Sequence, residues 1–296
     1  MPEPSAQQRS TRTDLALEER ELWHREAGDA AKIPGVRAET VVRRGVRTTV
    51  VRIENDEGSR ELHKPPGTYI TLELEDLRKQ EAWAFRRISE TLAGELRALM
   101  RLRPNAGVLV VGLGNEDVTP DALGPLVLRR LLITRHLANG QLPFAGLRRV
   151  SALQPGVLGT TGMESFEVVQ SVIDKTKPDA LIAVDALAAR SLDRLCATVQ
   201  LSDTGIVPGS GVGNRRMALT RERLGIPVFA VGAPTVADAT ALLPKDTAPG
   251  GDMIVTPRSI DTQVRMLAGV IGTGLNLSLQ NGLSLDQIEQ FVADGR

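Results

Sequence analysis

Two aspartates follow apolar runs, a pattern that places acidic side chains where a buried strand ends. Asp121 comes after the run 108–111 and the glycines at 112 and 114, and Asp185 directly ends the run 181–184. The two lie 64 residues apart, about two strand–helix units. We therefore expect both at the same edge of a parallel sheet, where α/β proteins place their active sites.

Two carboxylates that face each other share one proton, because neighbouring like charges do not both form easily. The ionised group can take a proton from water, and the protonated group can give one to a leaving amine, which suits peptide hydrolysis. The competing interpretation is structural. Thr119-Pro120 is typical of a helix start with Thr119 as N-cap, so Asp121 would only face the helix dipole and Asp185 would only cap a strand.

Other chemical motifs are weaker. The Asp-Thr-Gly tripeptide at 203–205 matches pepsin-like proteases, but those are β-rich folds, so a turn after a strand is the better interpretation. The glycine-rich segment 208–214 could present N–H groups to an oxyanion or a phosphate, or could be a flexible turn. The three histidines form no HExxH motif, and Cys196 is the only cysteine. This disfavours serine, cysteine and zinc hydrolases, and we expect neither a cofactor nor a metal.

The order of apolar runs predicts an α/β fold: a mostly parallel central sheet with helices on both faces, plus an N-terminal β meander. The predicted strands lie at 36–53 (a hairpin), 69–74, 107–112, 148–152, 180–184, 197–202 and 226–231. The predicted helices lie at 15–31 (with Asp14 as N-cap), 77–101, 120–136, 164–175, 216–224, 260–280 and 285–292. Pro244 to Pro257 is predicted to be a long loop.

Composition narrows the function classes. The 296 residues are 42% hydrophobic, enough for a substantial core. The 36 basic and 36 acidic residues give no net charge, so nothing global draws the chain to nucleic acid or to an anionic membrane. No apolar run approaches the roughly 20 residues of a membrane span, and the polar N-terminus lacks the apolar core of a secretory signal. The expected compartment is the cytoplasm.

Several motifs, in order over about residues 10–280, resemble the bacterial spore germination proteases. They are VGLGN (111–115), VTPDALGP (118–125), PGVLGTTGME (155–164), VDALAAR (184–190), DTGIVPGSGVGN (203–214) and GAPTV (232–236). The resemblance implies an atypical aspartic endopeptidase, similar in fold to hydrogenase maturation peptidases, that degrades small acid-soluble spore proteins in the forespore and spore core. It also implies that Asp121 and Asp185 are the catalytic pair, the same residues that the strand pattern indicates.

The resemblance further implies an inactive homotetrameric zymogen that removes its own N-terminal segment. Residues 13–18 resemble the family's cleavage motif, in which an acidic residue precedes an apolar one. We therefore expect autocleavage between Asp14 and Leu15, which divides the chain into a propeptide (1–14) and one protease domain (15–296).

An acidic residue before the scissile bond needs a cationic partner, for which Arg190, Arg215 and Arg216 are candidates. Backbone groups near Gly112 and Gly114, or near Gly211 in the glycine-rich segment, are candidates to stabilise an oxyanion. Two alternatives stay open. A metal-dependent maturation-type peptidase would hold a divalent ion with the same carboxylates, and a non-catalytic α/β module would bind a phosphate ligand at the glycine-rich segment.

Overall fold

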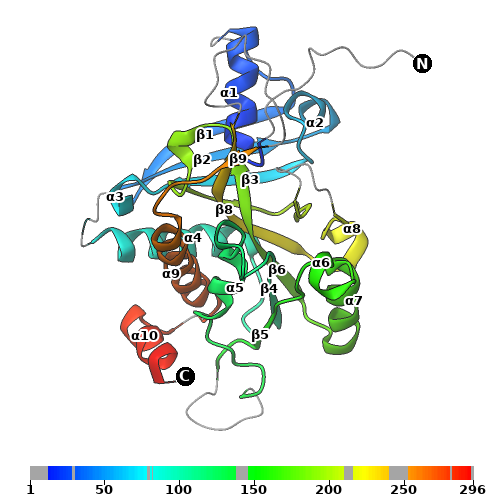
Figure 1. Cartoon of the computed structure of the whole chain (residues 1–296), viewed down its shortest axis with the longest axis vertical. Coiled ribbons are helices and arrows are strands. Elements are labelled where there is room, and N and C mark those ends of the chain that lie inside the picture. Colours follow the sequence, from blue (N-terminus) through cyan, green and yellow to red (C-terminus); the bar gives the residue numbers. More distant parts are fainter. Residues whose placement is uncertain are drawn as a thin grey trace.

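The structure is a computed structural model, and it describes residues 13–28, 31–78, 81, 83–137, 146–209, 216–239, 253–280 and 282–294. In this part of the chain nine strands form one mixed sheet, in the order β1-β2-β3-β7-β8-β6-β4-β5, with β9 paired to β8 (Figure 1). The α/β class predicted from the sequence is therefore confirmed.

The parallel half of the sheet carries the strands that alternate with helices along the chain. β4 (Val108–Gly112) lies between β5 (Val150–Leu153) and β6 (Ala180–Ala189), and β6 also pairs in parallel with β8 (Val228–Asp238). β6 is longer than β4, whose last residue, Gly112, is paired with Val184. The final five residues of β6 thus extend beyond the end of its neighbour.

The antiparallel half continues the same sheet. β7 (Thr198–Ser202) pairs with β8 on one side and with β3 (Gly67–Glu73) on the other. Next come β2 (Val46–Ile53) and β1 (Val36–Arg43), while β9 (Ile254–Val255) pairs with the end of β8. The predicted N-terminal meander is therefore β1 to β3, and β7 joins it to the parallel strands.

Helices cover both faces of the sheet, as predicted. α4 (Ala84–Met100), α5 (Leu123–Leu128) and α9 (Ile260–Leu279) pack on one face, against a large apolar cluster that includes Val110, Ile182 and Val184. α7 (Ser165–Thr176) packs on the other face, on a second cluster. Figure 1 shows α4, α5 and α9 together on one side of the sheet, α7 on the other, and α1 (Ala16–Ala27) beside the N-terminal strands.

The shorter elements are α2 (Asp56–Leu62), α3 (Glu75–Arg78), η2 (Thr119–Asp121), α6 (Leu158–Thr161), η3 (Leu192–Arg194), α8 (Arg221–Leu224) and α10 (Leu285–Asp294), where η marks a 3₁₀ turn. Among the described helices, none combines the length and the apolar character that a membrane crossing needs.

Several local predictions were wrong. The helix expected over 120–136 is only η2 and α5, because the chain then turns to β5: the N–H groups of Thr134 and Arg135 donate to the Val150 carbonyl at 3.0 and 2.9 Å. The helix expected over 216–224 is only α8. Thr119 does not cap a helix; its hydroxyl donates to Asp261 Oδ1 at 3.1 Å. The predicted loop 244–257 lies outside the described residues up to 252, and its end forms β9.

Candidate active site

Asp185 lies on β6, one residue beyond the end of β4. Its side chain is buried, with 5% of the residue exposed, and Oδ1 accepts a hydrogen bond from the Ala186 N–H at 2.9 Å. Burial raises the pKa of this carboxyl well above its usual range, and the charges of Asp121 and Asp14 raise it further. Three carboxyl groups from distant parts of the sequence are therefore neighbours at this edge of the sheet.

Asp121 is the last residue of η2, in the loop that crosses from the end of β4 into α5. Its Oδ2 accepts from the Asn115 N–H at 2.8 Å, which fixes the carboxyl against the loop. Burial raises the pKa of Asp121, and the hydrogen bond from Asn115 opposes that shift. The carboxyls of both residues thus hold a proton at higher pH than an exposed aspartate does.

Three glycines allow this loop to approach the sheet closely. A Cβ on Gly112 would lie 2.6 Å from the Gly124 carbonyl oxygen, and one on Gly124 would lie 2.7 Å from the Val184 carbonyl oxygen of β6. Gly114, with φ of +101°, has the Asp121 carbonyl oxygen 2.0 Å from the place of a Cβ. The structure therefore places Gly112 and Gly114 where they bring Asp121 toward β6, while their predicted oxyanion role stays a prediction.

The pair can perform acid–base chemistry. Burial raises the pKa of both carboxyls, and the charge of Asp121 raises that of Asp185 further, so an ionised Asp121 favours a protonated Asp185. An ionised carboxylate that accepts a proton from water, beside a carboxylic acid that donates one, is the arrangement required to hydrolyse an amide.

The N-terminal segment 13–16 lies against the open edge of β6, beyond the end of β4. The Asp14 N–H donates to the Ala188 carbonyl at 2.9 Å, and Asp14 Oδ2 accepts from the Ala188 N–H at 2.8 Å. Leu15 is fully buried in an apolar cluster with Leu187, Ala189, Leu195 and Ala237. The prediction that Asp14 caps the first helix was wrong, because Leu15 is the N-cap residue of α1 and the Asp14 carboxylate binds β6 instead.

Gln200, on β7, is a site residue that the sequence analysis missed. Its Nε2 donates to the Asp14 carbonyl oxygen at 3.0 Å, and its Oε1 accepts from the Ala16 N–H at 2.8 Å. Gln200 is 8% exposed, and an amide in a buried strand is the one signal that the sequence offered, since such a group needs partners. Which partners it has depends on the sheet order, which the sequence pattern did not give.

The predicted arginine and glycine-loop residues lie at varied places. The Arg190 backbone N–H donates to Glu18 Oε2 at 2.7 Å. Burial and the charge of Arg25 lower the pKa of the Arg190 guanidinium, so that side chain lies near α1. Arg216 Nη1 is 4.0 Å from Glu164 Oε1. Arg215 and Gly211 lie outside the described residues. A role for these four in substrate binding stays a prediction.

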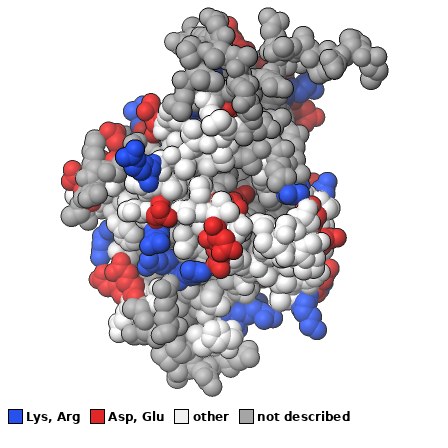
Figure 2. Space-filling model, in the orientation of Figure 1, with Lys and Arg blue, Asp and Glu red and all other residues white. Residues whose placement is uncertain are grey.

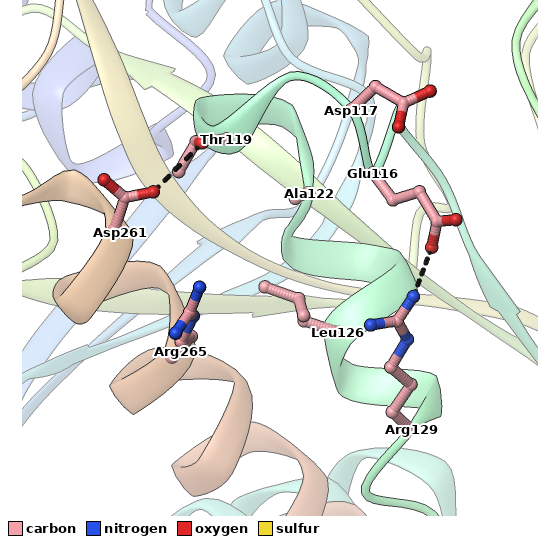
Figure 3. Close-up of a pocket in the computed structure, with 8 residues that line it drawn as sticks. All are labelled: Glu116, Asp117, Thr119, Ala122, Leu126, Arg129, Asp261 and Arg265. Atoms are coloured by element: carbon pink, nitrogen blue, oxygen red, sulfur yellow. Dashed lines mark hydrogen bonds and ion pairs between the residues drawn. The ribbon is translucent and has the colours of Figure 1, made fainter.

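A cavity of about 270 Å³ lies beside η2, between α5 and α9 (Figure 3). Its lining residues are Glu116, Asp117, Thr119, Ala122, Leu126, Arg129, Asp261 and Arg265. Arg129 pairs with Glu116 at 2.6 Å, and the Thr119–Asp261 hydrogen bond joins η2 to the first turn of α9. The cavity is lined by the residue next to Asp121 but not by Asp121 itself, so it flanks the carboxylate pair.

A cluster of metal-binding side chains is not found among the described residues. Within those ranges no three side chains of His, Cys, Asp or Glu are placed to hold a metal ion together. The carboxylates at the edge of β6 therefore do not form the donor set that a tightly held divalent ion needs.

Comparison with known proteins identifies relatives over most of the chain. Residues 13–248 match the family model described as germination protease. A germination protease of Caldanaerobacter subterraneus subsp. tengcongensis is 40% identical over 95% of this chain and 98% of its own length. That of Clostridium tetani is 37% identical over 96% and 99%, and that of a Geobacillus species is 44% identical over 79% and 65%.

Proposed function

Because the chain belongs to the germination protease family, and is therefore a protease of spore germination, we propose that Asp121 and Asp185 are its catalytic pair. The observation that carries this proposal is the buried Asp185 carboxyl, on which the charge of the half-buried Asp121 acts, with residues 13–16 held at the same strand. We propose that the bond between Asp14 and Leu15 is the first that the pair cleaves.

The proposed reaction is hydrolysis with water as the nucleophile. The ionised carboxylate of the pair takes one proton from water, whose oxygen bonds to the carbonyl carbon of Asp14. The C–N bond then breaks, and the protonated carboxyl gives its proton to the nitrogen of Leu15. The products are a carboxylate at Asp14 and a new amino terminus at Leu15, and the proton count on the pair is restored.

The substrates proposed beyond the chain itself are the small acid-soluble spore proteins, as the family resemblance implies. On the face shown in Figure 2, acidic and basic side chains are interspersed, which fits a zero net charge and a protein substrate rather than direct binding of nucleic-acid phosphates. We further propose a homotetrameric zymogen in the forespore and spore core, which sedimentation of the purified chain would measure as about four times 31.8 kDa.

The test is incubation of the purified full chain, and of its Asp121→Asn and Asp185→Asn variants, with a small acid-soluble spore protein. Mass spectrometry then identifies every fragment. We expect the wild type to release residues 1–14 and to cut the substrate, and both variants to lose at least about a hundredfold in rate, as removal of an acid–base group does. Asp174→Asn, at an exposed carboxylate on α7, is the matched control and should retain the wild-type rate.

Two results would contradict the proposal. Cleavage by Asp185→Asn at the wild-type rate would remove the carboxylate pair from the chemistry. Loss of wild-type activity in excess chelator, with recovery on adding a divalent ion, would favour the metal-dependent alternative.

A further inference from the structure

Gln200 of β7 lies in register with Asp185 of β6, two strands away in the sheet. In the strand register, Gly232 of β8 is the partner of Asp185 on one side and of Gln200 on the other. Residues in register project from the same face of a sheet, and two strand spacings separate them by about 10 Å. The Asp185 and Gln200 side chains therefore rise from one face, on either side of a glycine.

The glycine between them leaves room for the Leu187 side chain, which packs in the same apolar cluster as Leu15. A Cβ on Gly232 would lie 2.6 Å from the Leu187 side chain. Leu187 belongs to the apolar cluster that buries Leu15, the residue on the amine side of the proposed scissile bond. The segment 13–16 is thus bound by the Ala188 backbone of β6 and by the Gln200 side chain of β7.

The Gln200 amide contacts the chain on both sides of that bond. Its Oε1 accepts from the Ala16 N–H at 2.8 Å, which fixes the orientation of the amide and directs Nε2 at the Asp14 carbonyl oxygen, 3.0 Å away. The Asp14 carbonyl is the group that water attacks in the proposed cleavage. The donor lies at the distance expected for an oxyanion contact.

We infer that Gln200 is a catalytic residue, whose Nε2–H group stabilises the oxyanion formed from the scissile carbonyl; the inference rests on the proposed cleavage between Asp14 and Leu15. As water adds to the carbonyl carbon, the π electrons of the C=O bond move onto oxygen, where Nε2–H meets the new negative charge. When the double bond re-forms, the C–N bond breaks and the protonated carboxyl of the pair protonates Leu15 N. Both contacts are to main-chain atoms, so Gln200 would hold any substrate backbone in the same way.

The test replaces the donor and keeps the acceptor. Gln200→Glu retains an oxygen for the Ala16 N–H but loses Nε2–H. The matched control is Gln287→Glu in α10, where the side-chain oxygen accepts from the Ser284 N–H at 2.8 Å and is also retained. The measurement is the first-order rate of autocleavage of the full chain, per folded protein as determined by circular dichroism. We expect Gln200→Glu to be slower than the control by about a hundredfold or more, the usual loss of an oxyanion donor.

The pH dependence separates a lost donor from general damage. A protonated glutamic acid carries an O–H group that can donate in place of Nε2–H, so the deficit of Gln200→Glu relative to Gln287→Glu should narrow as the pH falls. Gln200→Met has no donor at any pH, and its deficit should stay large throughout.

Two outcomes would overturn the inference while leaving the proposed function intact, provided that Asp185→Asn is inactive in the same assay. One is a Gln200→Glu rate within about threefold of the control at every pH. The other is a Gln200→Met rate close to wild type, which would trace any loss in Gln200→Glu to its buried charge. Normal cleavage by Asp185→Asn would instead contradict the proposed function itself.

Discussion

Ionising the buried carboxyl of Asp185 costs free energy in the folded chain. Water is excluded from the side chain, and the charges of Asp121 and Asp14 oppose a further negative charge there. The Ala186 N–H offsets only part of this cost, since the pKa stays raised. A residue that served only to stabilise the strand end would not be expected in such surroundings, because an asparagine could accept the same hydrogen bond.

The free energy of unfolding of Asp185→Asn should therefore increase relative to that of the wild type as the pH rises. An unfolded aspartate loses its proton near a pKa of about 3.9, whereas folded Asp185 keeps its proton to higher pH. Above that pH the unfolded state binds fewer protons, so the free energy of unfolding of the wild type declines until the folded pKa is passed. Each unit of pKa difference corresponds to about 1.4 kcal/mol.

Urea unfolding from about pH 4 to pH 8 measures this effect as a widening gap between Asp185→Asn and wild type. Asp174→Asn, which removes an exposed carboxylate, is the matched control for the loss of an aspartate. A gap for Asp185→Asn that stays constant or closes with rising pH would show that the group is ionised in the folded chain.

The sequence indicated two of these residues and misjudged a third. Asp121 and Asp185 could be predicted because each follows an apolar strand, and the carboxyl ends of parallel strands share an edge. Asp14 was expected to cap α1, since a polar residue before a helix is usually a cap. In the structure a tertiary contact takes the place of the cap. At the open edge of β6, the N–H and C=O groups of Ala188 bind Asp14.

Among the elements, α5 lies close to the sheet because Gly124 carries no side chain. Its first turn lies so close to β4 and β6 that a Cβ on Gly124 would be 2.2 Å from the Leu113 carbonyl oxygen. Backbone atoms cannot yield as a flexible side chain can, so an alanine there must displace the helix. η2 precedes α5 directly, and Asp121 would move with it.

Gly124→Ala should accordingly lower both stability and activity. Overpacking of this kind costs roughly 1–3 kcal/mol of unfolding free energy. A shift of Asp121 by even an ångström should slow autocleavage by about tenfold to a hundredfold. Thermal unfolding and the autocleavage rate measure the two effects.

Gly94→Ala is the matched control for this prediction. Gly94 is an exposed glycine of α4 with open space around the position of a Cβ, and alanine in a helix should stabilise the chain by about 0.5–1 kcal/mol. If Gly124→Ala behaved like Gly94→Ala, the close approach of α5 would not be what positions Asp121.

Element types were easier to predict from the sequence than element ends. The strands β4, β6 and β8 are buried on both faces, so each is a continuous apolar run that can be recognised in the sequence. The helix expected to run to residue 136 ends at Leu128, because later backbone groups find other partners: the Leu132 N–H donates to Asn276 Oδ1 at 2.8 Å, and Thr134 pairs with β5. The partner in α9 is 144 residues away in the sequence, so the helical pattern around Leu128 could not reveal it.

For the whole molecule, the strand order determines which residues lie near Asp185 and the N-terminal segment. β7 is inserted between β8 and β3, so the N-terminal strands and the parallel strands share one sheet. This order places Gln200 in register with Asp185, and it lets Lys64, just before β3, donate to the Thr13 carbonyl at 3.0 Å. Sequence periodicity identifies strands but not their neighbours. Neither the register of Gln200 with Asp185 nor the bond from Lys64 to Thr13 could therefore be predicted.

The N-terminal segment is held by its own chain at many points, which predicts how autocleavage depends on concentration. Beyond the contacts of Asp14 and Leu15, the buried Glu18 carboxylate accepts from the Arg190 and Ser191 N–H groups at 2.7 and 2.9 Å and lies 3.5 Å from Arg194 Nε. A bond anchored on both sides within one chain reacts as a unimolecular process, because its effective concentration does not depend on that of the protein.

The half-life of autocleavage should therefore stay constant, within about twofold, over a hundredfold dilution. In a mixture with a mass-tagged Asp185→Asn chain, wild-type chains should be processed while the tagged chains keep residues 1–14. Mass spectrometry of the mixture over time distinguishes the two populations, with the tagged chain alone as the blank. A rate that rises in proportion to concentration, or processing of the tagged chain at the wild-type rate, would mean that one copy cleaves another. The segment held against β6 would then be a resting position that must be vacated before the bond reaches a catalytic pair.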